Sequence, residues 1–201
     1  MDETHRKSSL IAEVKRRKVV VIQDLLLLLN EAVRRNPHGV AVVSLHQPHL
    51  GLPGIAIEKK PDQLRWTYSQ LETGAKVLAS CLRESVLQKG NAILFFCENC
   101  AEYGLFCWTA VYLDCPFVPL NPRATSSAEE VQHMLKQVCP GVIVVTEGTV
   151  ASDIEINAHN ELASVPIKII LSPTDGAPTT GAQGWTQLEH MCLENGSASI
   201  L

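Results

Sequence analysis

Short, predominantly apolar runs recur along the second half of this chain and constrain its fold more than any other feature. Three of them cover residues 92–97, 141–146 and 167–171. Runs of this length are typical of strands that are buried on both faces, as in parallel sheets. Helix signals separate the runs, and strands that alternate with helices over short links imply right-handed crossovers. We therefore predict an α/β fold, with a mainly parallel, doubly wound sheet and flanking helices.

Capping signals indicate where the helices begin. Thr67 and Gln70 have capping-box spacing, in which a side chain bonds a free backbone N–H of the first turn. The helix that follows has a buried stripe at the 3.6-residue period, and Gly90 ends this unit. The stripe consists of Leu71, Ala75, Leu78, Ala79 and Leu82.

Two further helices follow the same logic, and a short strand over residues 116–120 separates them. The third helix stops at residues 139–141, because proline cannot continue a helix and glycine tolerates turns. The signals are Asn99 and Glu102 ahead of the second helix, which runs to about Leu113, and Ser126, Ser127, Glu129 and Glu130 ahead of the third.

The N-terminal residues have a different character. Residues 1–18 are charged and end in the run Lys-Arg-Arg-Lys, so we expect a disordered leader followed by one domain over residues 19–201. The apolar run 19–29 contains Asp24 and falls far short of the roughly 20 apolar residues of a membrane span. We predict a packed helix from Gln23 to about Arg35 and no transmembrane segment, and contact with a membrane surface stays open as an alternative.

Between this helix and Trp66 the pattern is looser. Residues 40–44 and the segment around 55–57 are candidate strands, joined by a loop rich in glycine and proline. Residues 172–184 are rich in Gly, Pro, Thr and Ser, which indicates a surface loop.

Charge and cysteine content exclude some classes of function. The formal net charge of −4 provides no basic footprint for nucleic acid, so we expect no nucleic-acid partner. Seven cysteines without a secretory signal indicate reduced thiols, and hence a cytoplasmic or organelle-matrix location.

The residues that could support chemistry are weak candidates. Cys97 and Cys100 have the spacing of a zinc or redox pair, but the four ligands of a structural zinc site are not present with suitable spacing. Residues 174–184 resemble a phosphate loop only in their glycines and threonines, because no lysine follows. Four histidines considered for acid–base roles are scattered, namely His38, His46, His49 and His133. We therefore predict no catalytic, cofactor-binding or metal-binding residue.

Residues 108–123 read W-T-A-V-Y-L-D-C-P-F-V-P-L-N-P-R, an apolar helix, a short strand and a proline-bracketed loop. This stretch resembles the "x-V-P-L-N-P" region of the adenylate-forming enzymes, the superfamily of acyl-CoA synthetases and adenylation domains. In the same order along the chain, residues 64–71 resemble that superfamily's "x-T-Y-x-E-L" motif, 90–93 its "G-D-x-V" motif and 97–102 its "x-N-x-x-E" motif.

The resemblance implies ATP-dependent activation of a carboxylic acid as an acyl-adenylate, followed by transfer to a thiol such as that of CoA. For a full-length enzyme it implies ATP, Mg and CoA as cofactors and a carboxylic acid as substrate. The superfamily's phosphate loop with its lysine, adenine-contacting motif, ribose-binding Asp and catalytic Lys have no counterparts in residues 1–201. We therefore expect an N-terminal fragment that is inactive and binds no cofactor on its own.

Two other interpretations stay open. The chain could be the adenylation piece of a nonribosomal-peptide-synthetase-like protein, which loads a carrier domain instead of CoA. It could instead be a non-catalytic interaction module, because an incomplete sheet leaves an exposed edge through which another chain can associate.

Overall fold

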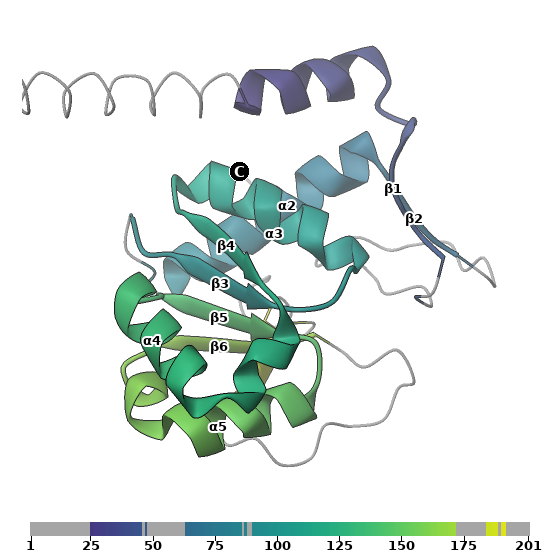
Figure 1. Cartoon of the computed structure of the whole chain (residues 1–201). Coiled ribbons are helices and arrows are strands. Elements are labelled where there is room, and N and C mark those ends of the chain that lie inside the picture. The colour runs from purple at the N-terminus through teal and green to yellow at the C-terminus, as the bar shows by residue number, and fades with distance from the viewer. Residues whose placement is uncertain are drawn as a thin grey trace, which may run out of the picture.

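The computed structural model describes residues 25–45, 47, 63–85, 87, 90–171, 184–188 and 190–191 (Figure 1). The first element is a helix over residues 25–35, called here the N-terminal helix. The strands are β1 (Val40–Ser44), β2 (Leu64–Thr67), β3 (Ile93–Phe96), β4 (Phe117–Leu120), β5 (Val142–Val145), β6 (Ile167–Ile170) and β7 (Thr186–Gln187). The later helices are α2 (Tyr68–Glu84), α3 (Ala101–Leu113), α4 (Ala128–Val138) and α5 (Gly148–Ala163), with a 3-10 helix η1 (Pro122–Ser126) before α4. The expected leader over 1–18 and the candidate strand at 55–57 lie outside the described residues.

The predicted apolar runs form a five-stranded sheet in the order β4-β3-β5-β6-β7. Every neighbouring pair is parallel, and Ile93 at the start of β3 lies opposite both Phe117 on β4 and Val142 on β5. All residues of β3 and β5 are buried, as expected of strands covered by helices on both faces. These observations confirm the predicted parallel sheet.

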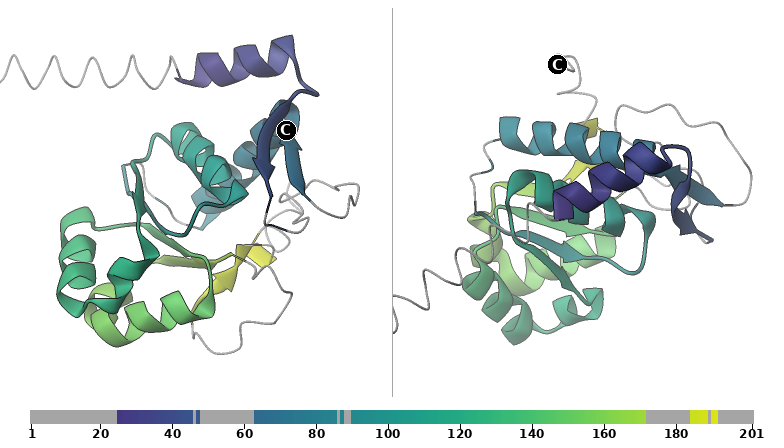
Figure 2. Two further views of the ribbon diagram at one scale, coloured as in Figure 1. Left: turned by 45° about the vertical axis from the view of Figure 1, so that its right-hand side comes forward. Right: turned by 90° about the horizontal axis from the view of Figure 1, so that it is seen from above.

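The sheet separates two layers of helices, each with its own core. Consecutive strand residues point to opposite faces, so Ile93 and Phe95 pack with α2 and α3, whereas Leu94 and Phe96 pack with α4 and α5. Figure 2 shows the α2–α3 layer on one side of the sheet and the α4–α5 layer on the other. The sheet is therefore doubly wound, as predicted.

The start of α2 agrees with its sequence signal. Thr67 accepts from the Gln70 backbone N–H while the Gln70 side chain accepts from the Thr67 N–H, so the predicted capping box is present. All five residues of the predicted stripe are buried. The helix ends at Glu84, however, and Gly90 lies in a later turn with φ 90°.

The bounds of α4 also follow local signals. Ser127 accepts a hydrogen bond from the Glu130 backbone N–H at 3.4 Å, and Cys139 ends the helix in the left-handed conformation with φ 47°. A Cβ atom at Gly141 would lie 2.5 Å from Leu87 Cδ1. The glycine therefore permits a close approach between the start of β5 and the chain before β3.

One helix, α5, was not predicted. It contains a kink at Ala158, whose φ of −144° and ψ of 39° are not helical. Next to the kink, the Asn157 carbonyl accepts from the Gln132 side chain on α4, and the Asn157 amide donates to the Thr125 carbonyl of η1. Contacts with two neighbouring elements therefore hold the kink in place.

β1 occupies the predicted residues and pairs antiparallel with β2. The strand β2 was not predicted from the sequence. Leu64 and Trp66 on β2 are buried and join the core on the α2–α3 side. The register shifts between Val40 and Val42, so β1 is irregular at its start. Within the described residues, no helix combines the length and the apolar character that crossing a bilayer requires.

β4 forms one edge of the five-stranded sheet. The Ile93 N–H donates to the Pro116 carbonyl at 2.8 Å, so alternate residues of β4 direct their backbone groups toward β3. Phe117 and Pro119 direct theirs outward. Because proline has no N–H, this edge lacks one of the donors that a pairing strand from another chain would use.

Candidate functional site

The strand order identifies a candidate place for a ligand on this sheet. In open parallel α/β sheets, ligands lie outside the carboxyl ends of strands at the point where the strand order reverses. Here β4 lies on one side of β3 and β5 on the other, so the reversal occurs at β3 and β5. The residues that follow these two strands, 97–100 and 146–147, are called here the switch-point site.

Two thiols and a hydroxyl lie at the switch-point site. Cys97 is 8% exposed, and its Sγ lies 3.8 Å from the Val144 carbonyl oxygen. Burial raises the pKa of the Cys97 thiol, Cys100 raises it further, and the Thr146 hydroxyl partly opposes the rise. Burial, followed by the Glu102 carboxylate, raises the pKa of Cys100 to about 12. Both thiols therefore form the reactive thiolate less readily than a free cysteine, which disfavours the redox role considered for this pair.

The first turn of α3 is capped by a residue from a distant part of the chain. Gln47, which follows β1, accepts a hydrogen bond from the Ala101 N–H through Oε1 at 2.6 Å. Its Nε2 donates to Oε2 of Glu102 at 2.7 Å, and Glu102 is only 3% exposed. The predicted cap at Asn99 is wrong, since α3 begins after Cys100, which makes no side-chain cap bond. Gln47 thus connects the end of β1 to the edge of the site.

The switch-point site does not fit the phosphates of ATP. Phosphate binding requires unoccupied backbone N–H groups and cationic side chains. Residues 97–100 and 146–147 contain two glutamates and no lysine or arginine. The Ala101 N–H is already bonded to Gln47, and Glu147 at the start of α5 accepts from the Thr149 hydroxyl at 2.8 Å. A phosphate here would therefore meet two glutamates, and residues 97–100 and 146–147 offer it no cation.

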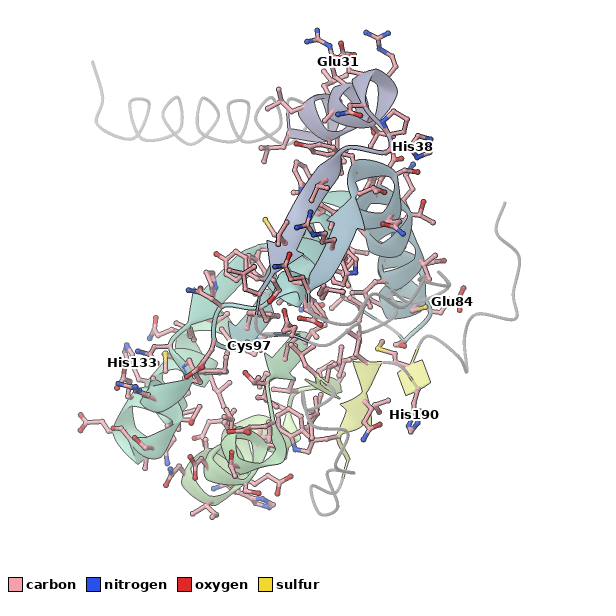
Figure 3. The ribbon with its side chains drawn as sticks, turned by 90° about the vertical axis from the view of Figure 1, so that its right-hand side faces the viewer. Glu31, His38, Glu84, Cys97, His133 and His190 are labelled. Carbon is pink, nitrogen blue, oxygen red and sulfur yellow. The ribbon has the colours of Figure 1, made fainter. Side chains whose placement is uncertain are left out.

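The remaining sequence candidates do not assemble into a catalytic group. His38 and His133 are exposed, and Figure 3 shows them, together with His190, on separate parts of the surface. His46 and His49 lie outside the described residues, as does the phosphate-loop candidate apart from its last glycine. Within the part of the chain that the structure describes, no three His, Cys, Asp or Glu side chains gather as a metal site.

A surface hollow of about 410 Å³ lies at the start of α4 and is lined by Ser127, Glu129, Glu130 and His133. A helix N-terminus attracts anions, but the two glutamates here oppose a second negative charge. The Ser127 hydroxyl already accepts from the Glu130 N–H. The hollow is therefore a poor phosphate site.

Comparison with known proteins relates the chain to one family and to several solved folds. The family described as AMP-binding enzyme matches residues 29–193, a region that includes every described strand. A curated relative, pseudomonine synthase PmsE of Pseudomonas entomophila (strain L48), is 28% identical over 116 residues. That alignment covers 56% of this chain and 19% of the relative.

Two solved structures share the fold. One is described as a long-chain-fatty-acid CoA ligase from Rhodopseudomonas palustris CGA009, with a TM-score of 0.50 and 19% identity over 64% of this chain and 30% of that one. The other, VinN, has a TM-score of 0.50 and 17% identity over 70% of this chain and 30% of its own. The matched part thus spans less than a third of each of these proteins.

Proposed function

This chain belongs to the AMP-binding enzyme family, and from that premise we propose that it is the N-terminal part of an ATP-dependent acid–CoA ligase. Such an enzyme joins a carboxylic acid to the AMP part of ATP, with release of pyrophosphate, and then transfers the acyl group to a thiol, with release of AMP. The observation that carries the proposal is the parallel, doubly wound sheet, which lies wholly within the family region. The fold shared with two solved structures, of which this chain covers only 30% each, supports the proposal that the chain is one part of a larger protein.

We propose further that these 201 residues are catalytically silent by themselves. The phosphate-transfer step needs positive groups that offset charge in the transition state, and the switch-point site contributes none. Carboxylate-dependent exchange between ATP and labelled pyrophosphate tests this with the 201-residue chain, and a complete ligase of the family serves as the positive control. With the acid present, we expect no more exchange than the background measured without acid. Acid-dependent exchange by this chain alone would overturn the proposed inactivity.

Sequencing the transcript beyond the codon for Leu201 tests the fragment proposal independently of any assay. We expect a continuing frame that encodes a Thr/Ser/Gly-rich loop with a lysine. A protein extended through that loop should then show acid-dependent exchange. A stop codon at this point would favour the non-catalytic interaction module.

One specific observation supports a second candidate for the acceptor of the acyl group, a carrier domain in place of CoA. The chain is 28% identical to pseudomonine synthase PmsE over the aligned part, compared with 19% and 17% for the two solved structures. The alternative function is therefore the adenylation part of a nonribosomal-peptide-synthetase-like protein. Offering the extended protein either CoA or a phosphopantetheinylated carrier protein, and measuring which forms an acyl thioester, distinguishes the two.

We propose a reducing compartment, the cytoplasm or an organelle matrix, for this protein. Cys97 and Cys100 are thiols with raised pKa values in largely apolar surroundings, which suits a structural role for reduced cysteine. Microscopy of the tagged full-length protein tests the compartment.

A further inference from the structure

Most of the exposed large apolar side chains among the described residues lie in residues 25–45, called here the N-terminal segment. Eight such side chains are exposed among the described residues, and six of them lie in this segment. The two most exposed in the helix, Leu27 and Leu28, have exposed fractions of 64% and 65%. The six are Leu25, Leu27, Leu28, Val40, Val43 and Leu45. An apolar surface concentrated in one segment is a feature of interaction sites.

The exposed leucines are not needed for the sheet. At about 100° per residue, Leu25, Leu27 and Leu28 fall within an arc of about 160° on the helix. Leu29 lies outside this arc and is 2% exposed, yet it belongs to neither core cluster of the sheet. The family match begins at residue 29, so the three exposed leucines precede the region shared with the family. The N-terminal helix therefore has an apolar face that the common fold does not explain.

The net charge of the chain also differs between its N-terminal part and the rest. Residues 1–35 contain eight Lys or Arg and five Asp or Glu, a net charge of +3, whereas residues 36–201 contain nine and sixteen, a net charge of −7. Four of the cations form the run 15–18, directly before the apolar run 19–29. Lysine and arginine attract acidic lipid headgroups, and an adjoining apolar helix face can enter the headgroup–acyl boundary.

We propose that the N-terminal segment binds the surface of a bilayer that contains anionic lipids. Leu25, Leu27 and Leu28 enter the headgroup region, and the positive charge of the run 15–18, which precedes the segment in the sequence, attracts acidic headgroups. The apolar run is too short to cross a bilayer, so the contact stays on one side. A second copy of the chain is the alternative occupant of this apolar face. The proposal does not depend on the adenylate-forming reaction.

The test is cosedimentation of the 201-residue chain with vesicles of phosphatidylcholine, with and without phosphatidylserine. We expect binding to the anionic vesicles that is at least about tenfold tighter than to the neutral ones and weakens with salt. The double variant Leu27→Glu and Leu28→Glu should weaken binding at least about tenfold. Ile156→Glu is the matched control, because Ile156 is 79% exposed on α5, and it should bind as the unchanged chain does.

A second variant replaces residues 15–18 with four glutamines and changes no described residue. It should lower the affinity for anionic vesicles by about a hundredfold or more, while its circular dichroism stays unchanged. The proposal is overturned if the chain binds neither vesicle, or if this variant and the leucine variant both bind as tightly as the unchanged chain. A concentration-dependent dimer that the leucine variant abolishes, without vesicle binding, would assign this face to a second copy instead.

Discussion

The five-stranded sheet and the N-terminal segment use apolar side chains in opposite ways. Every residue of β3 is buried between two helix layers, whereas three of the five consecutive leucines at 25–29 are exposed. Strands have two faces and both are covered here, but a helix with leucine all round can bury only the part that meets a neighbour. Apolar composition therefore does not decide burial in this protein, and the number of neighbouring layers does.

The largest expected effect comes from emptying the core of the sheet. Phe95 is fully buried, and its ring lies 5.4 to 5.8 Å from the rings of Tyr103, Phe106 and Phe117. Phe95→Ala should lower the free energy of unfolding by about 3–5 kcal/mol, measured by urea denaturation. Leu28→Ala, the matched truncation in the N-terminal segment, should stay within about 0.5 kcal/mol. Similar losses in the two variants would contradict the contrast between the two regions.

The second-largest loss of stability is expected at Gln47, which follows β1 and caps the start of α3. Gln47→Ala removes the cap on Ala101 and the amide donor to the buried Glu102, so we expect a loss of about 1–3 kcal/mol by the same measurement. Asn99→Ala is the control, because Asn99 is exposed and lies outside α3, and its effect should stay within about 0.5 kcal/mol. A larger loss for Asn99→Ala than for Gln47→Ala would reinstate the cap predicted from the sequence.

A smaller effect is expected where β2 passes into α2. Thr67→Ala removes one half of the capping box and should lower the free energy of unfolding by about 1 kcal/mol, while Thr67→Ser should retain most of the stability. Thr73 lies within α2 and its hydroxyl donates to the Ser69 carbonyl of the same helix, so Thr73→Ala serves as a control for the substitution itself. An equal loss at both positions would mean that the cap contributes little.

The smallest effect belongs to the N-terminal helix itself. Hydrogen bonds from Arg34 and then Arg35 lower the pKa of Glu31 from 4.5 to about 2. Because the folded pKa is the lower one, the interaction stabilises the helix above about pH 4.5 and is lost as the pH falls toward 2. All three side chains are solvent-exposed, so salt should weaken the interaction.

An NMR titration of the Glu31 carboxyl carbon measures this shift directly. In the double variant Arg34→Gln and Arg35→Gln, the pKa should return toward 4.5. An unchanged pKa in that variant would show that groups other than the two arginines hold the carboxylate.

Local signals were sufficient where they acted within one element. The strands β3, β5 and β6 and the caps at Thr67 and Ser127 follow from neighbouring residues alone. The helix α5 follows the helical period at its buried positions, but two of the four are alanines, so its apolar pattern has little contrast. The spacing of these four positions indicates the helix only when alanine is counted equally with larger apolar residues.

The candidate site could be predicted only in part. Sequence spacing placed Cys97 and Cys100 at the end of a core strand, and burial there explains their raised pKa values. The cap at Gln47 lies more than fifty residues away from the helix that it serves, as the separation of 54 between Gln47 and Ala101 shows. A local motif cannot report such a partner, so the local signal at Asn99 predicts the wrong cap.

The amino-acid sequence by itself determined the parallel sheet, because a strand made of consecutive apolar residues is buried only where both of its faces are covered. It also determined the starts of α2 and α4, since caps act over three or four residues. Only the tertiary structure decided which leucines are exposed, which distant side chain caps α3 and that the carboxyl ends of β3 and β5 lie side by side. These features depend on which segments meet in space, and contacts of that kind are set by the packing of whole layers.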